Sequence, residues 1–190
     1  MLVQNINLLN IRNRYRPNTP QKINFKGKDG LPDNFGIVDE GKLYRSANIL
    51  SKSEFEKLKE KGVTFIVDLR DPAEDGHSML HEKSRAYEFG LEHISFPDNE
   101  FCRDMEKLYK ITEDIYKKIQ KGGVGLIHCT MGEQRTGWVA AAYKFLYKNA
   151  DFKTVVDDYN RYCPNADSIS IYMLDFIKEV VDAKKLLKSI

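Results

Sequence analysis

The stretch VGLIHCTMGEQRTG, residues 124–137, indicates the fold of this chain. Its first five residues, VGLIH (124–128), form a mostly apolar run typical of a strand that is buried on both faces. A short loop containing glycine follows. Beyond it lie apolar residues with the spacing of the core-facing side of a helix, namely Val139, Ala142, Tyr143 and Leu146. This order of strand, loop and helix places the loop at the carboxyl end of a strand, where open α/β sheets bind ligands.

The rest of the sequence predicts the same alternation of helices and strands. Ser51 and Glu54 form a capping box at the start of a helix that Gly62 ends. Residues 41–49, GKLYRSANI, are predicted to form an edge strand or a turn. Further strands are predicted at 63–69 and 91–96, and further helices at 78–89, 104–121, 152–162 and 168–188. We therefore expect an α/β fold with a central, mostly parallel sheet of about four or five strands flanked by helices.

Composition and length exclude several classes of protein. The chain has 190 residues, and we expect one domain at 25–190 after an extension at 1–24. A net charge of +2 argues against partners such as nucleic acid. The three cysteines show no CxxC spacing, so we expect no metal site and no disulfide framework. Because no segment reads as a secretion signal or a membrane span, a cytoplasmic protein is expected.

The loop after residue 128 has the residue types of an anion site. A helix that begins near Arg135 directs its unpaired N–H groups and the positive end of its dipole at the loop. Cys129 stands at the head of the loop, where these groups and Arg135 are expected to stabilise its thiolate as a nucleophile. The planar Arg135 guanidinium can hold two phosphoryl oxygens. The remaining oxygen is expected to bind the loop amides, which belong to Thr130, Met131, Gly132, Glu133, Gln134 and Arg135.

Three further residues receive roles in this chemistry. Gly132 allows the loop to turn where a side chain would crowd the bend or the anion. Thr136 can offer its hydroxyl to the sulfur of Cys129 when that sulfur leaves a phosphoenzyme. Asp98 in the segment FPDNEF is predicted to be the general acid for the leaving oxygen and later the base toward water. A turn-forming role for Asp98 remains open, with Glu100 or Asp104 as the acid instead.

The motif HCTMGEQRTG matches every fixed position in the signature of the cysteine-based protein tyrosine and dual-specificity phosphatases. FPD resembles the WPD acid loop of that superfamily, with Phe96 in place of tryptophan. LYRSA, and DLR with a later glutamate, resemble its compact bacterial and fungal members, so the resemblance covers about residues 34–165. It implies that a phosphoprotein or small phosphorylated substrate is hydrolysed without a metal or other cofactor, through a cysteinyl phosphate. It also implies that phosphate, sulfate or vanadate binds in the active site.

The substrate class is less well defined by the sequence. Many relatives carry basic residues where this chain has Glu133 and Gln134, and a negative side chain at the pocket rim disfavours a highly phosphorylated inositol or a phosphoinositide. We therefore expect phosphotyrosine, alone or together with phosphoserine and phosphothreonine. An inositol phosphate or phosphoinositide phosphatase and a phosphate-binding pseudophosphatase remain alternatives. A rhodanese-like sulfurtransferase is disfavoured by the sequence GEQRTG.

Other polar residues near these motifs are open to two interpretations. His128 either tunes the environment of the thiolate, as the resemblance implies, or only fills buried hydrogen bonds. Arg70 is expected to form a structural ion pair with Glu74 or another carboxylate, with contact to the substrate as the alternative, and Arg45 is interpreted in the same way. Cys102 is interpreted as a small buried hydrophobe, with a protective disulfide to the loop cysteine as the alternative.

Overall fold

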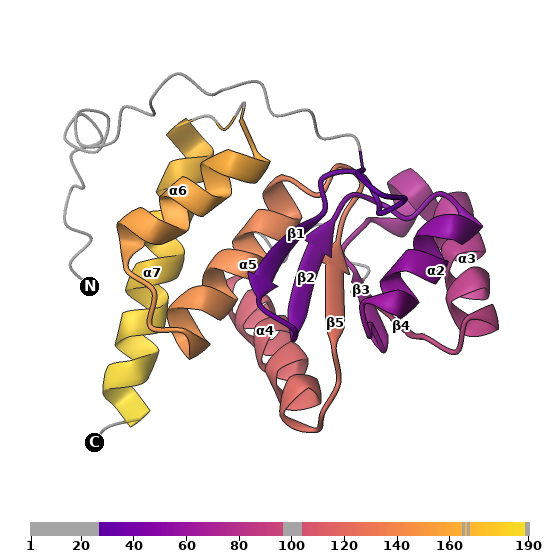
Figure 1. Ribbon diagram of the computed structural model, residues 1–190. Coiled ribbons are helices and arrows are strands. Elements are labelled where there is room, and N and C mark those ends of the chain that lie inside the picture. Colours follow the sequence, from indigo (N-terminus) through magenta and orange to yellow (C-terminus); the bar gives the residue numbers. More distant parts are fainter. Residues whose placement is uncertain (1–26, 97–103, 165, 167, 189–190) are drawn as a thin grey trace.

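The computed structural model describes residues 27–96, 104–164, 166 and 168–188 (Figure 1). Its strands are β1 (Gly36–Asp39), β2 (Leu43–Ser46), β3 (Phe65–Asp68), β4 (Glu92–Ser95) and β5 (Gly125–His128). The helices in these residues are α2 (Lys52–Glu60), α3 (Pro72–Glu88), α4 (Met105–Gln120), α5 (Gln134–Tyr147), α6 (Phe152–Tyr162) and α7 (Ser168–Lys188). Figure 1 shows α2 and α3 on one side of the sheet and the other four helices on the opposite side.

The five strands form one sheet in the order β1-β2-β5-β3-β4. β1 pairs antiparallel with β2, and all other pairs are parallel. The predicted α/β class and mostly parallel sheet are therefore confirmed. The register pairs His128 with both Ser46 and Asp68, and Asp68 with Ser95. The four parallel strands consequently end together, and the segments that follow them meet at one edge of the sheet.

The sheet separates two hydrophobic cores because successive side chains of a strand point to opposite faces. Phe65 and Val67 pack into the larger core with helices α4 to α7. Ile66 packs into the smaller core with Phe55 and Leu58 of α2. Both faces are covered by helices, so β3 and β5 are buried on both faces. This explains why the strands predicted at 63–69 and 124–128 were nearly continuous apolar runs without a polar alternation.

The strand predicted within 41–49 is present as β2, but its expected place at an edge of the sheet was wrong. β2 lies inside the sheet between β1 and β5, and all four of its residues are buried. The actual edge on this side is β1, which was not predicted. The polar residues of LYRS are typical of an exposed edge strand. In the structure, however, the Arg45 side chain is buried and donates hydrogen bonds to the loop after β5.

Two helices also differ from the prediction. α3 begins at Pro72 and not at residue 78, because Asp71 caps it through a 2.8 Å hydrogen bond from the N–H of Ala73. The interior glycine Gly76 made the first turns resemble a loop. α5 is buried around most of its circumference and not on one stripe alone, since α4, α6 and α7 all pack against it. The capping box of Ser51 and Glu54 on α2 is confirmed.

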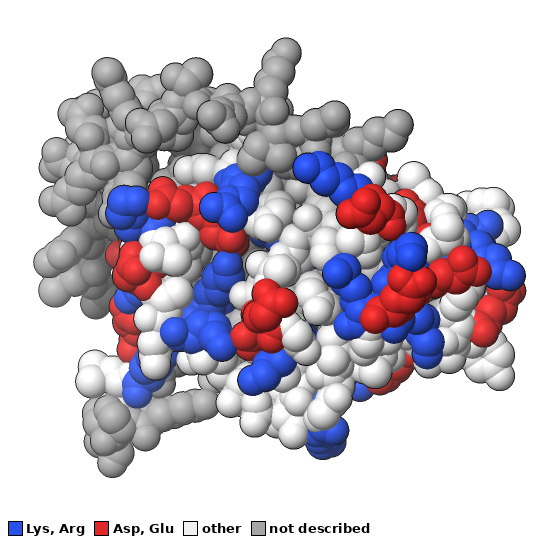
Figure 2. Space-filling view, viewed as in Figure 1, with Lys and Arg blue, Asp and Glu red and all other residues white. Residues whose placement is uncertain are grey.

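Some predictions concern residues that the structure does not describe. The extension at 1–24, Asp98 and Cys102 all lie outside the described residues, so the division at residue 25 stays a prediction. Within the described ranges, no helix combines the length and apolar character needed to cross a bilayer. On the face shown in Figure 2, lysine and arginine side chains alternate with aspartate and glutamate side chains.

Candidate active site

Cys129 directly follows β5, at the edge where the parallel strands end. Its side chain is buried, with 4% exposure. Residues 129–133 form the loop, and α5 begins at Gln134. The predicted order of strand, loop and helix is therefore present, with the cysteine at the carboxyl end of a central strand.

Four consecutive carbonyl groups of this loop accept hydrogen bonds from outside it. The donors are Asn48 N to Thr130 O (3.2 Å), Asn34 Nδ2 to Met131 O (3.0 Å), and Arg45 Nη2 to Gly132 O (2.7 Å) and Glu133 O (3.3 Å). The C=O and N–H groups of a trans peptide unit point in opposite directions. With these carbonyls turned toward the body of the protein, the N–H groups of residues 131–134 face the other side of the loop. The loop is thereby shaped as a cradle of amide donors.

Gly132 is required at its position for two separate reasons. Its φ angle is +69°, a left-handed conformation that residues with a Cβ rarely adopt. A Cβ atom here would also lie 2.4 Å from the backbone oxygen of Ser46. The predicted role of this glycine in the turn is confirmed. A side chain at this position would clash with the backbone of β2.

Arg45 holds the loop from β2. Its side chain is completely buried, and its guanidinium lies 4.3 Å from the centre of the Tyr162 ring. Burial lowers the pKa of Arg45 from its ordinary value, although nearby acidic groups oppose this shift. Among the described residues, Arg45 therefore does not form the ion pair expected for it: it binds loop carbonyls and the Tyr162 ring, so its role is structural but its partners are not carboxylates.

The first turn of α5 leaves its amide groups available for an anion. The N-cap residue Glu133 makes no side-chain hydrogen bond to the helix start. Its carboxylate instead accepts a contact from Cys163 Sγ at 3.7 Å, and the side chain is half-buried. Met131 and Gln134 are exposed. The negative charge expected at the rim is thus directed toward Cys163, where burial and Glu133 raise the pKa of the thiol to about 11.

Arg135 curls back over the loop, as its spacing from Cys129 predicts. Its Nη2 lies 3.4 Å from Thr130 Oγ1, and its Nη1 donates to the carbonyl of Leu69 at 3.2 Å. Thr130 Oγ1 in turn donates to Asp75 of α3 at 2.7 Å. The guanidinium is therefore placed by the loop and by the segment after β3 together.

Thr136 lies in the first turn of α5 and is completely buried. Its hydroxyl has no hydrogen-bond partner among the described residues. A buried hydroxyl without a partner costs free energy, so such groups are commonly explained by a catalytic role or a ligand. This placement is compatible with the role predicted for Thr136 toward the cysteine sulfur.

His128, the residue before Cys129, is buried in a charged cluster. Its Nε2 lies 2.8 Å from Glu82 Oε1, and its Nδ1 lies 3.4 Å from the carbonyl oxygen of Cys129. Burial lowers the pKa of His128, but attraction to Glu82 outweighs it and the net shift is upward. For Glu82, burial raises the pKa, but His128, His93 and Arg70 together hold it well below the ordinary range.

The ion pair predicted for Arg70 is present. Its guanidinium donates to both oxygens of Asp68, at 2.9 and 2.8 Å, and contacts Glu82 Oε2 at 2.9 Å. The carboxylates are therefore those of Asp68 and Glu82, while the side chain of Glu74 lies outside the described part of the structure. Arg70 is buried and joins β3 to α3 beneath the loop.

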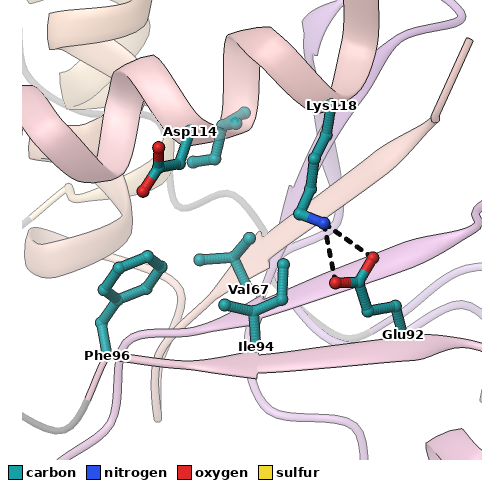
Figure 3. A pocket seen from close by; sticks show the side chains of 7 residues that line it. Val67, Glu92, Ile94, Phe96, Asp114 and Lys118 are labelled. Carbon is teal, nitrogen blue, oxygen red and sulfur yellow. Dashed lines mark hydrogen bonds and ion pairs between the residues drawn. The ribbon is translucent and has the colours of Figure 1, made fainter. Parts of the chain in front are cut away.

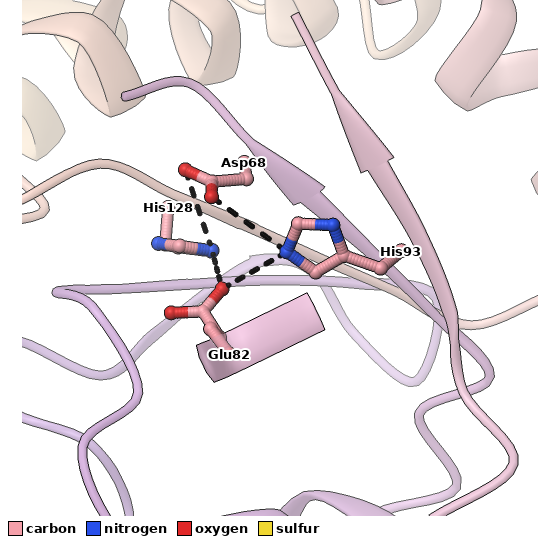
Figure 4. Close-up of side chains that lie close together, drawn as sticks. All are labelled: Asp68, Glu82, His93 and His128. Atoms are coloured by element: carbon pink, nitrogen blue, oxygen red, sulfur yellow. Dashed lines mark hydrogen bonds and ion pairs between the residues drawn. The ribbon is translucent and has the colours of Figure 1, made fainter. Parts of the chain in front are cut away.

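One group of described residues has the side chains and spacing of a metal site. Asp68, Glu82, His93 and His128 each offer a ligand atom, and these atoms all lie within 4.8 Å of one another. Figure 4 shows the four side chains converging. Both carboxylates already contact Arg70, however, and a cation added here would lie close to its guanidinium. Because Arg70 already supplies positive charge to both carboxylates, these residues are not assigned as metal ligands.

A hollow of about 130 Å³ lies between α4 and the β4 edge of the sheet (Figure 3). Its lining includes Val67, Ile94 and Phe96, with an ion pair between Lys118 and Glu92 at its rim. None of the loop residues 129–135 lines it. Phe96 extends the pairing of β4 through a hydrogen bond from its N–H to the carbonyl of Asp68 at 3.1 Å. Phe96 thus lies at the edge of the sheet that also carries the loop, and the described part of the chain stops there until residue 104.

The sequence reasoning missed several residues that support the loop. Asn34 and the donor role of Arg45 depend on chain segments that meet only in the fold, so no local pattern marks them. Glu82 carried a usable signal. It lies between the buried Met79 and Ala86 on the inward face of α3, and a carboxylate on such a face indicates a buried partner.

The family of this chain follows from comparison with known proteins. The family model described as "Tyrosine phosphatase family" matches residues 18–169, which is most of the chain. The chain belongs to the tyrosine phosphatase family. Its general activity is accordingly that of a phosphatase, and the loop from Cys129 to Arg135 lies within the matched region.

Solved structures of cysteine-based phosphatases share the fold. TpbA of P. aeruginosa has a TM-score of 0.60 at 18% identity, covering 78% of this chain and 91% of its own. The catalytic core of the PP-IP phosphatase Siw14 of S. cerevisiae has 0.60 at 20% identity, with coverage of 82% and 94%. Tk-PTP in its active form has 0.59 at 21% identity, with coverage of 77% and 97%. At these sequence identities, the similarity shows that the proteins share a fold, and it shows nothing further about their substrates.

Proposed function

We propose that this phosphatase hydrolyses phosphomonoesters of proteins without a metal, through a cysteinyl-phosphate intermediate on Cys129. The observation that carries the proposal is the set of four loop carbonyls turned toward the body of the protein, because it leaves a cradle of amide donors on the other side of the loop beside a buried cysteine. Such a cradle at a helix N-terminus suits a tetrahedral dianion. Arg135 completes it with a planar pair of donors.

In the first half-reaction, the thiolate of Cys129 attacks phosphorus and the bond between phosphorus and the ester oxygen breaks. The leaving oxygen takes a proton from Asp98, the general acid of the proposal. The amides of residues 130–135 and the guanidinium of Arg135 stabilise the charge on the three equatorial oxygens. His128 contributes by shaping the environment of the thiolate from the preceding position.

In the second half-reaction, water attacks the phosphorus of the intermediate while Asp98 accepts a proton from it. The bond between phosphorus and sulfur breaks, and the thiolate is restored. Thr136 offers its unpartnered hydroxyl to the leaving sulfur, which lowers the cost of the developing charge. Inorganic phosphate is then released from the same cradle, which sulfate or vanadate can also occupy.

For the substrate we propose phosphotyrosine, alone or with phosphoserine and phosphothreonine, in cytoplasmic proteins. The rim of the loop supports this choice because it carries the exposed apolar side chain of Met131 and no lysine or arginine between Cys129 and Arg135. Among the proteins that share the fold, TpbA has been crystallised with pTyr. An aromatic ring can pack against a methionine side chain at the mouth of a pocket.

A second candidate is an inositol phosphate or phosphoinositide. The Siw14 core, which shares the fold, is a PP-IP phosphatase. The direction of the Glu133 carboxylate toward Cys163 also weakens the repulsion that the sequence predicts for a polyanion. The absence of basic residues within the loop still favours the protein substrate.

The test measures phosphate release by the purified protein from a panel of phosphopeptides and inositol phosphates. Faster release from phosphotyrosine peptides than from inositol phosphates supports the proposal, whereas the reverse order selects the second candidate. A Cys129→Ser variant should release no phosphate from any of them. If the wild-type protein binds vanadate but turns over no phosphomonoester, it is a pseudophosphatase and the proposal fails.

A further inference from the structure

Glu82 stands at the centre of the buried cluster behind the catalytic loop. Its Oε1 faces His128 Nε2 at 2.8 Å and His93 Nε2 at 3.2 Å. Its Oε2 contacts Arg70 Nη2 at 2.9 Å and accepts from the N–H of Ile49 at 3.3 Å. The carboxylate thus joins α3 to the segments that follow β2 and β3, to β4 and to the last residue of β5. No role in the proposed chemistry has been assigned to it so far.

The neighbours of His128 determine which of its nitrogens carry protons. Nδ1 lies 3.4 Å from the carbonyl oxygen of Cys129, which can only accept a hydrogen bond. Nε2 lies 2.8 Å from Glu82 Oε1, and although the ring N–H is not aimed straight at this oxygen, two lone pairs would repel at that distance. Both nitrogens therefore face acceptors. An imidazole satisfies two acceptors only when it is doubly protonated and positively charged.

The charge balance of the cluster agrees with this assignment. Arg70 faces both carboxylates, and its single positive charge leaves one negative charge uncompensated. A charged His128 brings the sum to zero, which is the stable arrangement for buried ions. His93 fits as a neutral ring, because its Nε2 can donate to Glu82 and its Nδ1 can accept from Ser95 Oγ at 3.5 Å.

The consequence for the loop follows from the position of His128. The Nδ1 proton is directed at the carbonyl of Cys129, the peptide group at which the loop leaves the sheet. Loss of that proton would leave the Nδ1 lone pair facing the carbonyl oxygen of Cys129. The hydrogen bond that holds this peptide group in place would then be lost. It would also remove a positive charge from the residue next to the cysteine, where a thiolate has to be stabilised.

We propose that Glu82 is a positioning residue of the active site, which keeps His128 doubly protonated and turned toward the carbonyl of Cys129. The inference rests on the proposed function for its kinetic consequences, but the protonation state can be measured without any substrate. Glu82 touches neither the substrate nor the sulfur in this scheme. It acts through His128, with Arg70 and His93 holding its other contacts.

The experiment uses the full-length protein labelled with nitrogen-15 in its four histidines, each assigned by single replacement. Nitrogen chemical shifts of imidazole rings distinguish the charged form from the two neutral tautomers. At neutral pH, His128 should be charged in the wild type and neutral in Glu82→Gln. With p-nitrophenyl phosphate, kcat/KM of this variant should fall about 10- to 100-fold at neutral pH. The deficit should shrink at acidic pH, where His128 regains its proton.

The matched control is Glu88→Gln, the same change at an exposed position of the same helix, and it should alter neither the spectrum nor the kinetics. Glu82→Asp retains a carboxylate and should restore part of the His128 charge. A neutral His128 in the wild type at neutral pH would overturn the proposal, even if no variant folded. So would a Glu82→Gln variant that behaves like Glu88→Gln, or one equivalent of zinc that binds to both His93 and His128.

These outcomes are separable from those of the proposed function. If the wild-type protein hydrolyses no phosphomonoester, the proposed function fails, yet the spectra still show whether Glu82 sets the protonation of His128. If the protein is an active phosphatase but His128 is neutral, the inference about Glu82 fails alone.

Discussion

The guanidinium of Arg45 donates a hydrogen bond of 2.7 Å to the carbonyl oxygen of Gly132, and this contact joins β2 to the loop at 129–133. The same Nη2 atom also reaches the carbonyl of Glu133 at 3.3 Å. A residue far away in the sequence thereby fixes the direction of two peptide groups in the loop. The predicted anion cradle depends on it.

Arg45→Lys should weaken both the fold and the site. A lysine retains the charge, but its single ammonium group cannot reproduce the planar contacts to the carbonyls and the Tyr162 ring. We expect the free energy of unfolding in urea to fall by about 2 kcal/mol and vanadate to bind more weakly. The control is Lys42→Ala, an exposed change in the adjacent turn. Unchanged vanadate affinity in Arg45→Lys would show that the loop does not need this anchor.

Gly132→Ala tests the close approach of the loop to β2. Alanine would have to adopt a φ of +69° and place its Cβ 2.4 Å from the oxygen of Ser46. The control is Gly122→Ala, where φ is +89° but no atom lies within 4 Å of the added Cβ. Gly122→Ala should lose about 1 kcal/mol of stability from the left-handed backbone, and Gly132→Ala should lose more because its Cβ also clashes with the backbone of β2. Only Gly132→Ala should lose phosphatase activity as well, and equal activity in the two variants would refute the steric argument.

Thr136→Val should separate function from stability. The hydroxyl of Thr136 is buried and has no partner among the described residues, so its removal should leave the free energy of unfolding unchanged or higher. Breakdown of the phosphoenzyme should slow, which pre-steady-state kinetics with p-nitrophenyl phosphate can measure. Thr112→Val is the opposite case, because it removes a 2.7 Å hydrogen bond from the buried Thr112 hydroxyl to the carbonyl of Leu108 within α4. That variant should lose about 1 kcal/mol and keep its turnover.

The pKa shift of His128 makes a prediction about stability and pH. Burial lowers the pKa of His128, but the contacts with Glu82 and Asp68 outweigh burial, so the pKa in the folded protein lies above the unfolded value. The stabilisation should therefore be complete below the unfolded pKa of about 6.5 and should be lost as the pH rises through the folded pKa. Urea unfolding of the wild type and His128→Gln over this range measures it. A stability difference that grows with rising pH would have the wrong sign.

Much of the fold could be predicted because the deciding segments are local. The apolar runs that became β3 and β5, and the capping box of Ser51 and Glu54, depend on neighbouring residues alone. The place of β2 in the sheet could not be predicted in this way. It depends on pairing with a strand about eighty residues later, and strands that pair over such distances carry no mark of their neighbour.

The site divides in the same manner. Cys129, Gly132 and Arg135 lie in one short stretch whose spacing is itself informative, and the structure brings Arg135 back over the loop. The residues that hold the loop from outside come from separate strands and helices. Asn34 could be recognised only when the fold showed which carbonyl it faces, and although the position of Glu82 on the inward face of α3 indicates a buried partner, only the fold identifies that partner as His128. The role of Asp98 stays a prediction.

The central claim is that Cys129 becomes phosphorylated during turnover, and rapid acid quenching tests it most directly. An Asp98→Asn variant should slow the release of the intermediate and make it easier to trap during reaction with p-nitrophenyl phosphate. Mass spectrometry should then find one added phosphoryl group on the peptide that contains Cys129, and none in Cys129→Ser. Sustained turnover by the wild type with no phosphoryl group on that peptide, or with turnover retained in Cys129→Ser, would contradict the account.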